Sequence, residues 1–170
     1  QNQSSAASDV YKRQVNMKEV GRAFGALKKT IMAMNIGSFL GFFVGILPAA
    51  GATPASLMSY GITKQLSKNS KEFGSGVPAG VVAPECANNS ASTGSMLPML
   101  TLGIPGSPTT AILLGGMILW GLTPGPLLFT QEPEFVWGLI GSLYIANFFT
   151  LVLNIALIPA FLMVLRIPFA

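Results

Sequence analysis

The sequence predicts an all-α integral membrane protein, a polytopic helical bundle in which proline and glycine break several helices. Hydrophobic residues make up 51% of the chain and charged residues only 9%, whereas a typical soluble domain carries about 25% charged residues. The charges stand at the edges of long uncharged runs, as they do in loops that flank membrane helices. Proline and glycine interrupt two of these runs, at residues 47–54 and 103–109. Lipid tolerates such breaks only where protein or a cavity covers the freed backbone groups.

The composition also excludes several classes of function. The formal net charge of +4 comes from residues that flank apolar runs rather than from a basic patch, so we expect no nucleic-acid partner. The chain has no histidine, which excludes His-dependent catalysis. Cys86 is the only cysteine, which excludes an intrachain disulfide and a cysteine-based zinc site. We therefore expect no enzyme activity, no catalytic residue, no cofactor and no firm metal site.

The first 29 residues divide into two parts. Residues 1–14 are polar, lack helical periodicity and do not form a signal peptide, so we expect a non-native or disordered leader, with a transmembrane domain fragment at 15–170. Residues 16–29 are basic, with Val20, Phe24 and Leu27 at helical spacing. This pattern favours a helix at the cytoplasmic membrane interface, with an ordinary loop helix as the alternative.

The first uncharged run covers residues 30–63 and is broken in its middle by Pro48, Gly51 and Pro54. Lysines flank both ends of the run. Under the positive-inside rule this arrangement favours a helical hairpin or re-entrant segment that returns to the cytoplasmic side, rather than a single crossing. Lys28 and Lys64 are therefore predicted to lie on the same side of the membrane.

A second uncharged run covers residues 86–131 and is interrupted at residues 102–110. The segments GILPAAGATPAS (45–56) and LGIPGSPTTA (102–111) form a weak internal repeat. Paired broken helices are typical of the binding sites of secondary transporters, so we expect a partial repeat of such a fold. The alternative is that the breaks are tight turns between ordinary spans. The last run, 135–165, is long enough for one tilted or kinked span.

Polar and small residues in and near the two breaks form the candidate site for substrate or ion. Amides and hydroxyls can donate to a carboxylate, and their oxygens and free carbonyls can bind sodium. Glu85 is the only acid in this central region and a candidate for cation coupling. The alternative is that Pro84 and Glu85 begin a helix whose asparagines pack against another helix. The candidate residues are Asn88, Asn89, Ser90, Ser92 and Thr93; Gly103, Pro105, Gly106, Ser107, Thr109 and Thr110; and Pro48, Gly51, Thr53 and Ser56.

Four segments carry a resemblance to a known family. PECANNSASTGSMLPMLTLGIPGS (84–107) with TTAILLGGMILWGLTPGP (109–126), GILPAAGATPASLMSY (45–60) and FGSG (73–76) stand in the expected order. Together they resemble the large permease subunit of the tripartite tricarboxylate transporters. The chain departs from the family pattern at Ala49, where glycine is usual, and at Cys86, where a small residue such as alanine is usual. Alanine tolerates fewer backbone conformations than glycine.

The resemblance implies a longer, multi-pass permease in the bacterial inner membrane. Its expected partners are a small membrane subunit and a periplasmic substrate-binding protein. Its expected substrates are tricarboxylates such as citrate, or related organic acids, taken up by symport with sodium ions or protons. The chain has no Gly-x-x-x-x-Gly-Lys-[Ser/Thr] phosphate loop that would bind ATP. A non-transporting membrane scaffold or a channel subunit is the alternative.

Overall fold

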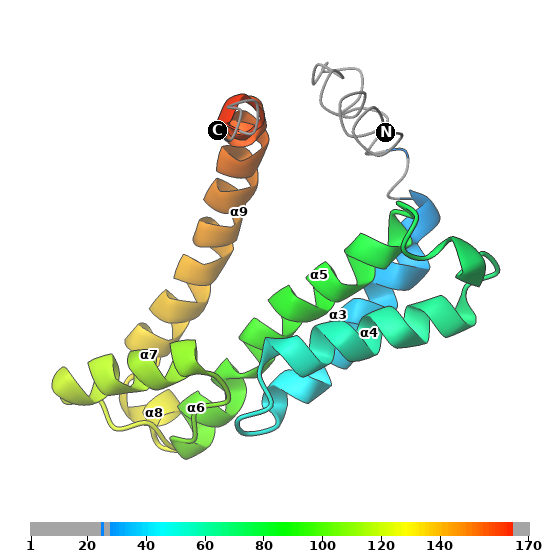
Figure 1. Cartoon of the computed structure of the whole chain (residues 1–170). Coiled ribbons are helices and arrows are strands. Elements are labelled where there is room, and N and C mark those ends of the chain that lie inside the picture. Colours follow the sequence, from blue (N-terminus) through cyan, green and yellow to red (C-terminus); the bar gives the residue numbers. More distant parts are fainter. Residues whose placement is uncertain (1–24, 26–27, 165–170) are drawn as a thin grey trace, which may run out of the picture. The chain divides into compact units, whose positions relative to one another are not determined.

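The structure, a computed structural model, describes Gly25 and residues 28–164, without the side chains of residues 158–164. All secondary structure in this part of the chain is helical, which confirms the predicted all-α class (Figure 1). The chain forms two units, one of residues 26–133 and one that contains residues 134–170. The leader at 1–14 and most of the interfacial helix at 16–29 lie outside the described residues.

A hairpin of two helices begins the first unit. The 3₁₀ turn η1 (Lys28–Thr30) leads into α3 (Ile31–Ile46), and a five-residue loop connects α3 to α4 (Ala52–Leu66). The break predicted at residues 47–54 and the helical hairpin are thereby confirmed. A second 3₁₀ turn, η2 (Ser70–Glu72), precedes α5 (Ala79–Gly94), which packs against both arms of the hairpin (Figure 1).

Small residues make the contact between α3 and α5. Glycines recur every fourth residue on α3, and alanines recur at the same interval on α5, so the two backbones lie against each other. An added Cβ at Gly41 would lie 2.6 Å from Cα of Ala87, and one at Gly45 would lie 2.7 Å from Cα of Ala91. Because residue numbers rise together along both helices, α3 and α5 are parallel. We name the residues that face each other in this contact the small-residue seam: Gly37, Gly41 and Gly45 of α3, and Ala83, Ala87 and Ala91 of α5.

The rest of the first unit consists of three shorter helices. They are α6 (Met96–Leu102), α7 (Pro108–Leu119) and α8 (Leu128–Gln131). The loop between α6 and α7 confirms the predicted break at residues 103–109. The second uncharged run is also interrupted in two places that were not predicted. Pro98 cannot donate a backbone hydrogen bond, which weakens the helix at the boundary between α5 and α6 near Ser95.

The second unpredicted interruption follows α7. Gly121 has a φ of 76° and ends the helix, with the N–H of Leu122 donating to the carbonyl of Met117 at 3.0 Å. Gly115, Gly116 and Gly121 have no side chain that would prevent a close helix contact. No atom of the described residues outside their own helical surroundings lies within 4 Å of a Cβ added at any of them. Close contacts are instead made by Gly37, Gly41 and Gly45 of α3, by Gly94 of α5 and by Gly106.

The second unit contains one long helix, α9 (Pro133–Val164), of 32 residues. The helix is continuous through Pro159 and is roughly 48 Å long at 1.5 Å per residue. Two segments of the described chain have the length and composition to cross a membrane, Lys28–Ile46 and Pro133–Leu157. The polytopic arrangement and the partial repeat stay predictions.

Candidate functional site

The two helix breaks lie at the same end of the three-helix layer formed by α3, α4 and α5. Gly106, in the second break, is buried against the last turn of α3 and the end of α5. A Cβ added at Gly106 would lie 3.0 Å from the carbonyl oxygen of Gly45 and 2.8 Å from Cβ of Ser95. Gly45 stands in the last turn of α3, just before the first break. The backbone of one break therefore contacts the helix that leads into the other.

Hydroxyl groups lie near the place where Gly106 contacts Gly45 and Ser95, named here the junction. Ser107 caps α7, because its Oγ accepts from the N–H of Thr110 at 3.2 Å while Oγ1 of Thr110 accepts from the N–H of Ser107 at 2.9 Å. The Oγ of Ser95 lies 3.4 Å from the Oγ of Ser107. Ser95 was not among the residues predicted for the site, although it follows Ser92 by one helical turn. Of the other predicted residues in this break, Gly103 and Pro105 are half-buried and Thr109 is exposed.

The first break is built on two residues with positive φ, Ala49 at 61° and Gly51 at 69°. Ala49 occupies a left-handed conformation that disfavours alanine, and it is the position at which the resembled family usually has glycine. Pro48 and Thr53 are exposed. Ser56 does not face open space, because its Oγ donates to the carbonyl of Pro84 at 3.0 Å and joins α4 to α5.

A polar face runs along α5, on the side opposite the small-residue seam. Its members follow one another at one-turn intervals and all are exposed. The residues of this face, named here the α5 polar face, are Glu85, Asn88, Asn89, Ser92 and Thr93. The face leads to the junction, because Oγ of Ser95 donates to the carbonyl of Ser92 at 2.8 Å. Ser90 lies apart from it and donates to the carbonyl of Ser38 on α3 at 2.6 Å.

Hydrogen bonds within α5 satisfy part of this face. Nδ2 of Asn89 donates to the carbonyl of Glu85 at 2.9 Å, and Oγ of Ser92 donates to the carbonyl of Asn88 at 3.0 Å. Thr93 makes a longer bond of the same kind, 3.4 Å, to the carbonyl of Asn89. These bonds use donors and leave side-chain oxygens free to accept. The carboxamide of Asn88 keeps its donors as well as its acceptor, since no bond joins it to another described residue.

The alternative in which Pro84 and Glu85 begin a helix is wrong. The helix begins at Ala79, so Pro84 lies inside it and Glu85 lies on its exposed face rather than at its start. Pro84 removes one backbone hydrogen bond from α5. Glu85 stands one turn before Asn88 and Asn89 on the polar face, and its role in cation coupling stays a prediction.

Comparisons with known proteins agree with the features of the chain. The family model described as the tripartite tricarboxylate transporter TctA family matches residues 1–170. An uncharacterized protein in the TAR-II ttuC' 3' region of Agrobacterium vitis is 46% identical over 129 residues, 76% of this chain and 53% of that protein. An uncharacterized 52.8 kDa protein in the TAR-I ttuC' 3' region of the same organism is 44% identical over 133 residues, 78% of this chain and 26% of that protein. The chain thus spans about half and about a quarter of these relatives, and no solved structure matches it.

Proposed function

Because this chain belongs to the TctA family of tripartite tricarboxylate transporters, we propose that it is part of the permease subunit of a binding-protein-dependent secondary transporter. In this proposal the permease takes up tricarboxylates such as citrate, or related organic acids, by symport with sodium ions or protons. It lies in the bacterial inner membrane as a multi-pass protein. Its partners are a small membrane subunit and a periplasmic substrate-binding protein.

The observation that best supports a transport pathway here is the α5 polar face. Polar side chains that face lipid are costly, so in membrane proteins they face a cavity or the interior of the bundle. One side of α5 is packed on α3 through alanines, while its other side exposes a carboxylate, two carboxamides and two hydroxyls. A water-filled pathway along this side would solvate these groups.

The same residues suit the chemistry of a carboxylate carrier. The amide groups of Asn88 and Asn89 can donate to a substrate carboxylate, and hydroxyl and carbonyl oxygens can bind a sodium ion. Residues 72–131, which include the α5 polar face, contain neither arginine nor lysine, so a substrate held there meets neutral donors rather than fixed positive charge. An amide donor lacks the positive charge and the bidentate geometry of an arginine, so it holds a carboxylate less tightly, which favours release of the substrate after transport.

The junction lies at the end of α5 and would add oxygen atoms to this site. Gly106 and Gly45 bring backbone groups together without intervening side chains. Ser95, Ser107 and Thr110 add hydroxyl oxygens beside them. In the proposed mechanism the substrate contacts the polar face and the coupling ion lies toward the junction, so that loading of one favours binding of the other.

Uptake of labelled citrate by the complete three-part transporter, with and without a sodium gradient, tests the proposal. Asn88→Ala and Asn89→Ala should each leave a substrate or ion oxygen unpaired, a loss of about 1–3 kcal/mol. That loss corresponds to a fall in apparent affinity of roughly fivefold to a hundredfold or more. Leu151→Ala, on the exposed surface of α9, is the matched control and should transport normally.

The amount of each variant in the membrane must be measured in the same cells. Normal uptake by both asparagine variants would mean that the polar face packs against protein and has no part in transport. A complete system that transports no organic acid would favour the second candidate, a scaffold or channel subunit.

A further inference from the structure

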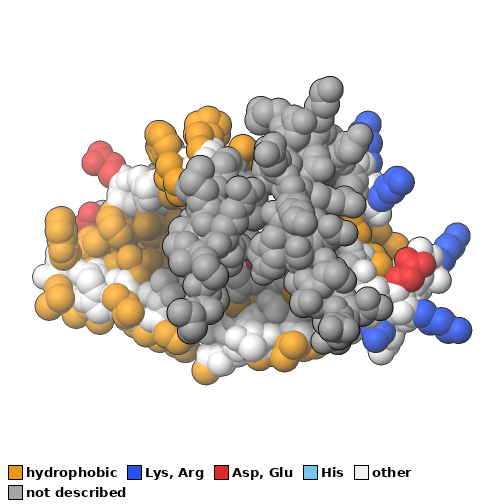
Figure 2. All heavy atoms as spheres, turned by 45° about the horizontal axis from the view of Figure 1, so that its top comes forward, with side chains coloured by type: hydrophobic (Ala, Val, Ile, Leu, Met, Phe, Trp, Pro, Cys, Tyr) orange, Lys and Arg blue, Asp and Glu red, His pale blue; other side chains and the backbone are white. Residues whose placement is uncertain are grey.

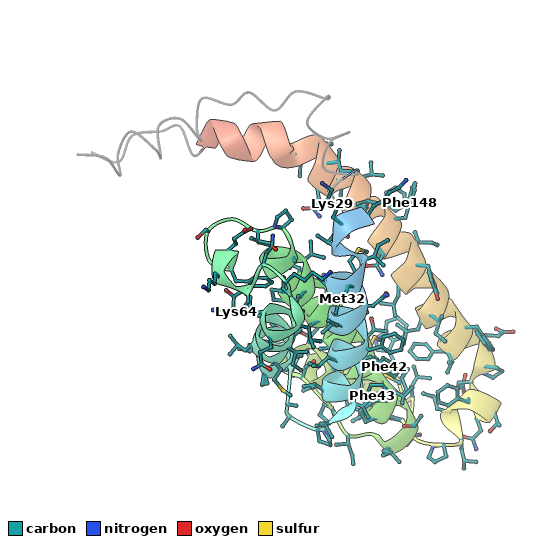
Figure 3. All side chains as sticks on the ribbon, turned by 90° about the vertical axis from the view of Figure 1, so that its right-hand side faces the viewer. Lys29, Met32, Phe42, Phe43, Lys64 and Phe148 are labelled. Atoms are coloured by element: carbon teal, nitrogen blue, oxygen red, sulfur yellow. The ribbon has the colours of Figure 1, made fainter. Side chains whose placement is uncertain are left out.

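The five lysines of the described residues lie at one end of the first unit. Lys28 and Lys29 belong to η1, Lys64 is in the last turn of α4, and Lys68 and Lys71 follow in the connector to α5. Figure 2 shows their side chains gathered at one end of the visible surface, and Figure 3 shows Lys29 and Lys64 away from the turn of the hairpin near Phe43. All five are exposed. We name this group the lysine rim.

The fold brings these lysines together from distant parts of the sequence. The arms of the hairpin have nearly equal lengths, 16 residues in α3 and 15 in α4, so the end of α4 returns to the start of α3. An aromatic contact holds the connector. The ring of Phe73 is buried and meets the ring of Tyr60 edge-on, with centroids 5.6 Å apart. The contact keeps the segment that carries Lys68 and Lys71 close to α4.

The surface beside the lysine rim is apolar. Ile31 and Met32 follow Lys29 on α3 and are 53% and 56% exposed, and Leu66 is exposed beside Lys64 and Lys68. Glu72 is the only acid between residues 28 and 84, and its carboxylate accepts a hydrogen bond from Asn69 at 3.2 Å. A ring of positive charge above exposed apolar side chains matches the boundary between phosphate headgroups and acyl chains.

We propose that the lysine rim binds the headgroups of anionic phospholipids, with the exposed apolar side chains below it in contact with the acyl chains. Each ammonium group can donate to a phosphate oxygen, and the flexible lysine stems can lie along the apolar surface. An acidic soluble protein would match the charge alone, whereas a phospholipid matches the charge and the neighbouring apolar surface. Bound anionic lipid would hold this end of the hairpin at one face of the membrane.

Native mass spectrometry of the full-length detergent-purified permease tests the proposal with two probes, phosphatidylglycerol and phosphatidylethanolamine. We expect phosphatidylglycerol to bind more tightly, with the preference falling as salt rises from 0.1 to 1 M, where the screening length shrinks from about 10 to about 3 Å. Replacement of all five lysines by glutamine should reduce phosphatidylglycerol binding at least tenfold, at about fivefold for each lysine in contact with a headgroup. Replacement of the same lysines by arginine is the matched control and should preserve binding.

Three results would overturn the proposal. Equal binding of the two lipids by the parent protein would show that the rim has no headgroup preference, and this measurement needs no variant to fold. Unchanged binding by the glutamine variant would place the lipid elsewhere. Displacement of the lipid by millimolar glycerol phosphate would show that the lysines recognise a soluble phosphate and not the membrane.

Discussion

Substitution of Gly41 by alanine tests the small-residue seam between α3 and α5. The new Cβ would lie 2.6 Å from Cα and 2.8 Å from the carbonyl carbon of Ala87. Ordinary contacts of a Cβ begin near 3.4 Å, so the two helices must move apart by close to 1 Å. Both partners are backbone atoms in the middle of helices, and no side-chain rotation can relieve the clash.

The cost follows from packing. A gap of 0.5–1 Å forfeits about a quarter to a half of the dispersion energy of each contact along the seam. Overpacking of a close interface costs about 1–3 kcal/mol, whereas alanine gains up to about 1 kcal/mol of helix propensity over glycine. We expect Gly41→Ala to lower the free energy of unfolding by about 1–2 kcal/mol.

The matched control is Gly116→Ala, because Gly116 is also helical and no described atom lies within 4 Å of its added Cβ. Thermal unfolding of the purified full-length protein in detergent, followed by fluorescence-detected size exclusion, compares the two variants. Gly116→Ala should unfold at or above the temperature of the parent and Gly41→Ala several degrees below it. Equal unfolding temperatures would refute direct backbone packing between α3 and α5.

Three further predictions follow from the breaks and from the lysine rim. Ala49→Gly should raise the unfolding free energy by about 0.5–1 kcal/mol in thermal unfolding, because the relief of left-handed strain outweighs the greater entropy of glycine in the unfolded chain. A fall in the unfolding free energy would mean that alanine is not strained there. Gly106→Ala should lower the unfolding free energy by about 1–3 kcal/mol, because its Cβ would meet backbone and a buried serine, and the amount of protein in the membrane should fall as a result. Normal stability and a normal amount of protein would contradict the close contact at Gly106. Lys28→Cys and Lys64→Cys, each in a Cys86→Ala background, should react with an impermeant maleimide from the same side of the membrane; reaction from opposite sides would contradict the hairpin.

The breaks in the helices could be predicted because proline and glycine act locally. Pro48, with Gly51 three residues later, disfavours a regular helix, and the structure breaks the first run there. The flanking lysines likewise predicted the hairpin, although the side of the membrane on which they lie stays a prediction. The departure at Ala49 predicted a conformational problem, and the residue indeed has a φ of 61°.

The packing partners could not be predicted in the same way. Both Gly37-x-x-x-Gly41 and the pair Gly115–Gly116 satisfy the composition expected of close helix contacts, and only the folded position of α5 decides between them. The alternative that began a helix at Pro84 failed for a similar reason, because a proline inside a helix is tolerated when the surrounding structure supports it. The polar cluster of α5 could be predicted from its residue types, but the orientation of Ser90 toward α3 depends on the helical phase that packing sets.

The claim that the α5 polar face lines a transport pathway is tested most directly by accessibility. The measurement is the rate at which an impermeant maleimide labels Asn88→Cys in a full-length Cys86→Ala permease, with Ala87→Cys, which is fully buried on the opposite side of α5, as the control. We predict that Asn88→Cys reacts, that citrate slows its reaction, and that Ala87→Cys does not react. An unreactive Asn88→Cys, or labelling that citrate leaves unchanged, would contradict a pathway along this face.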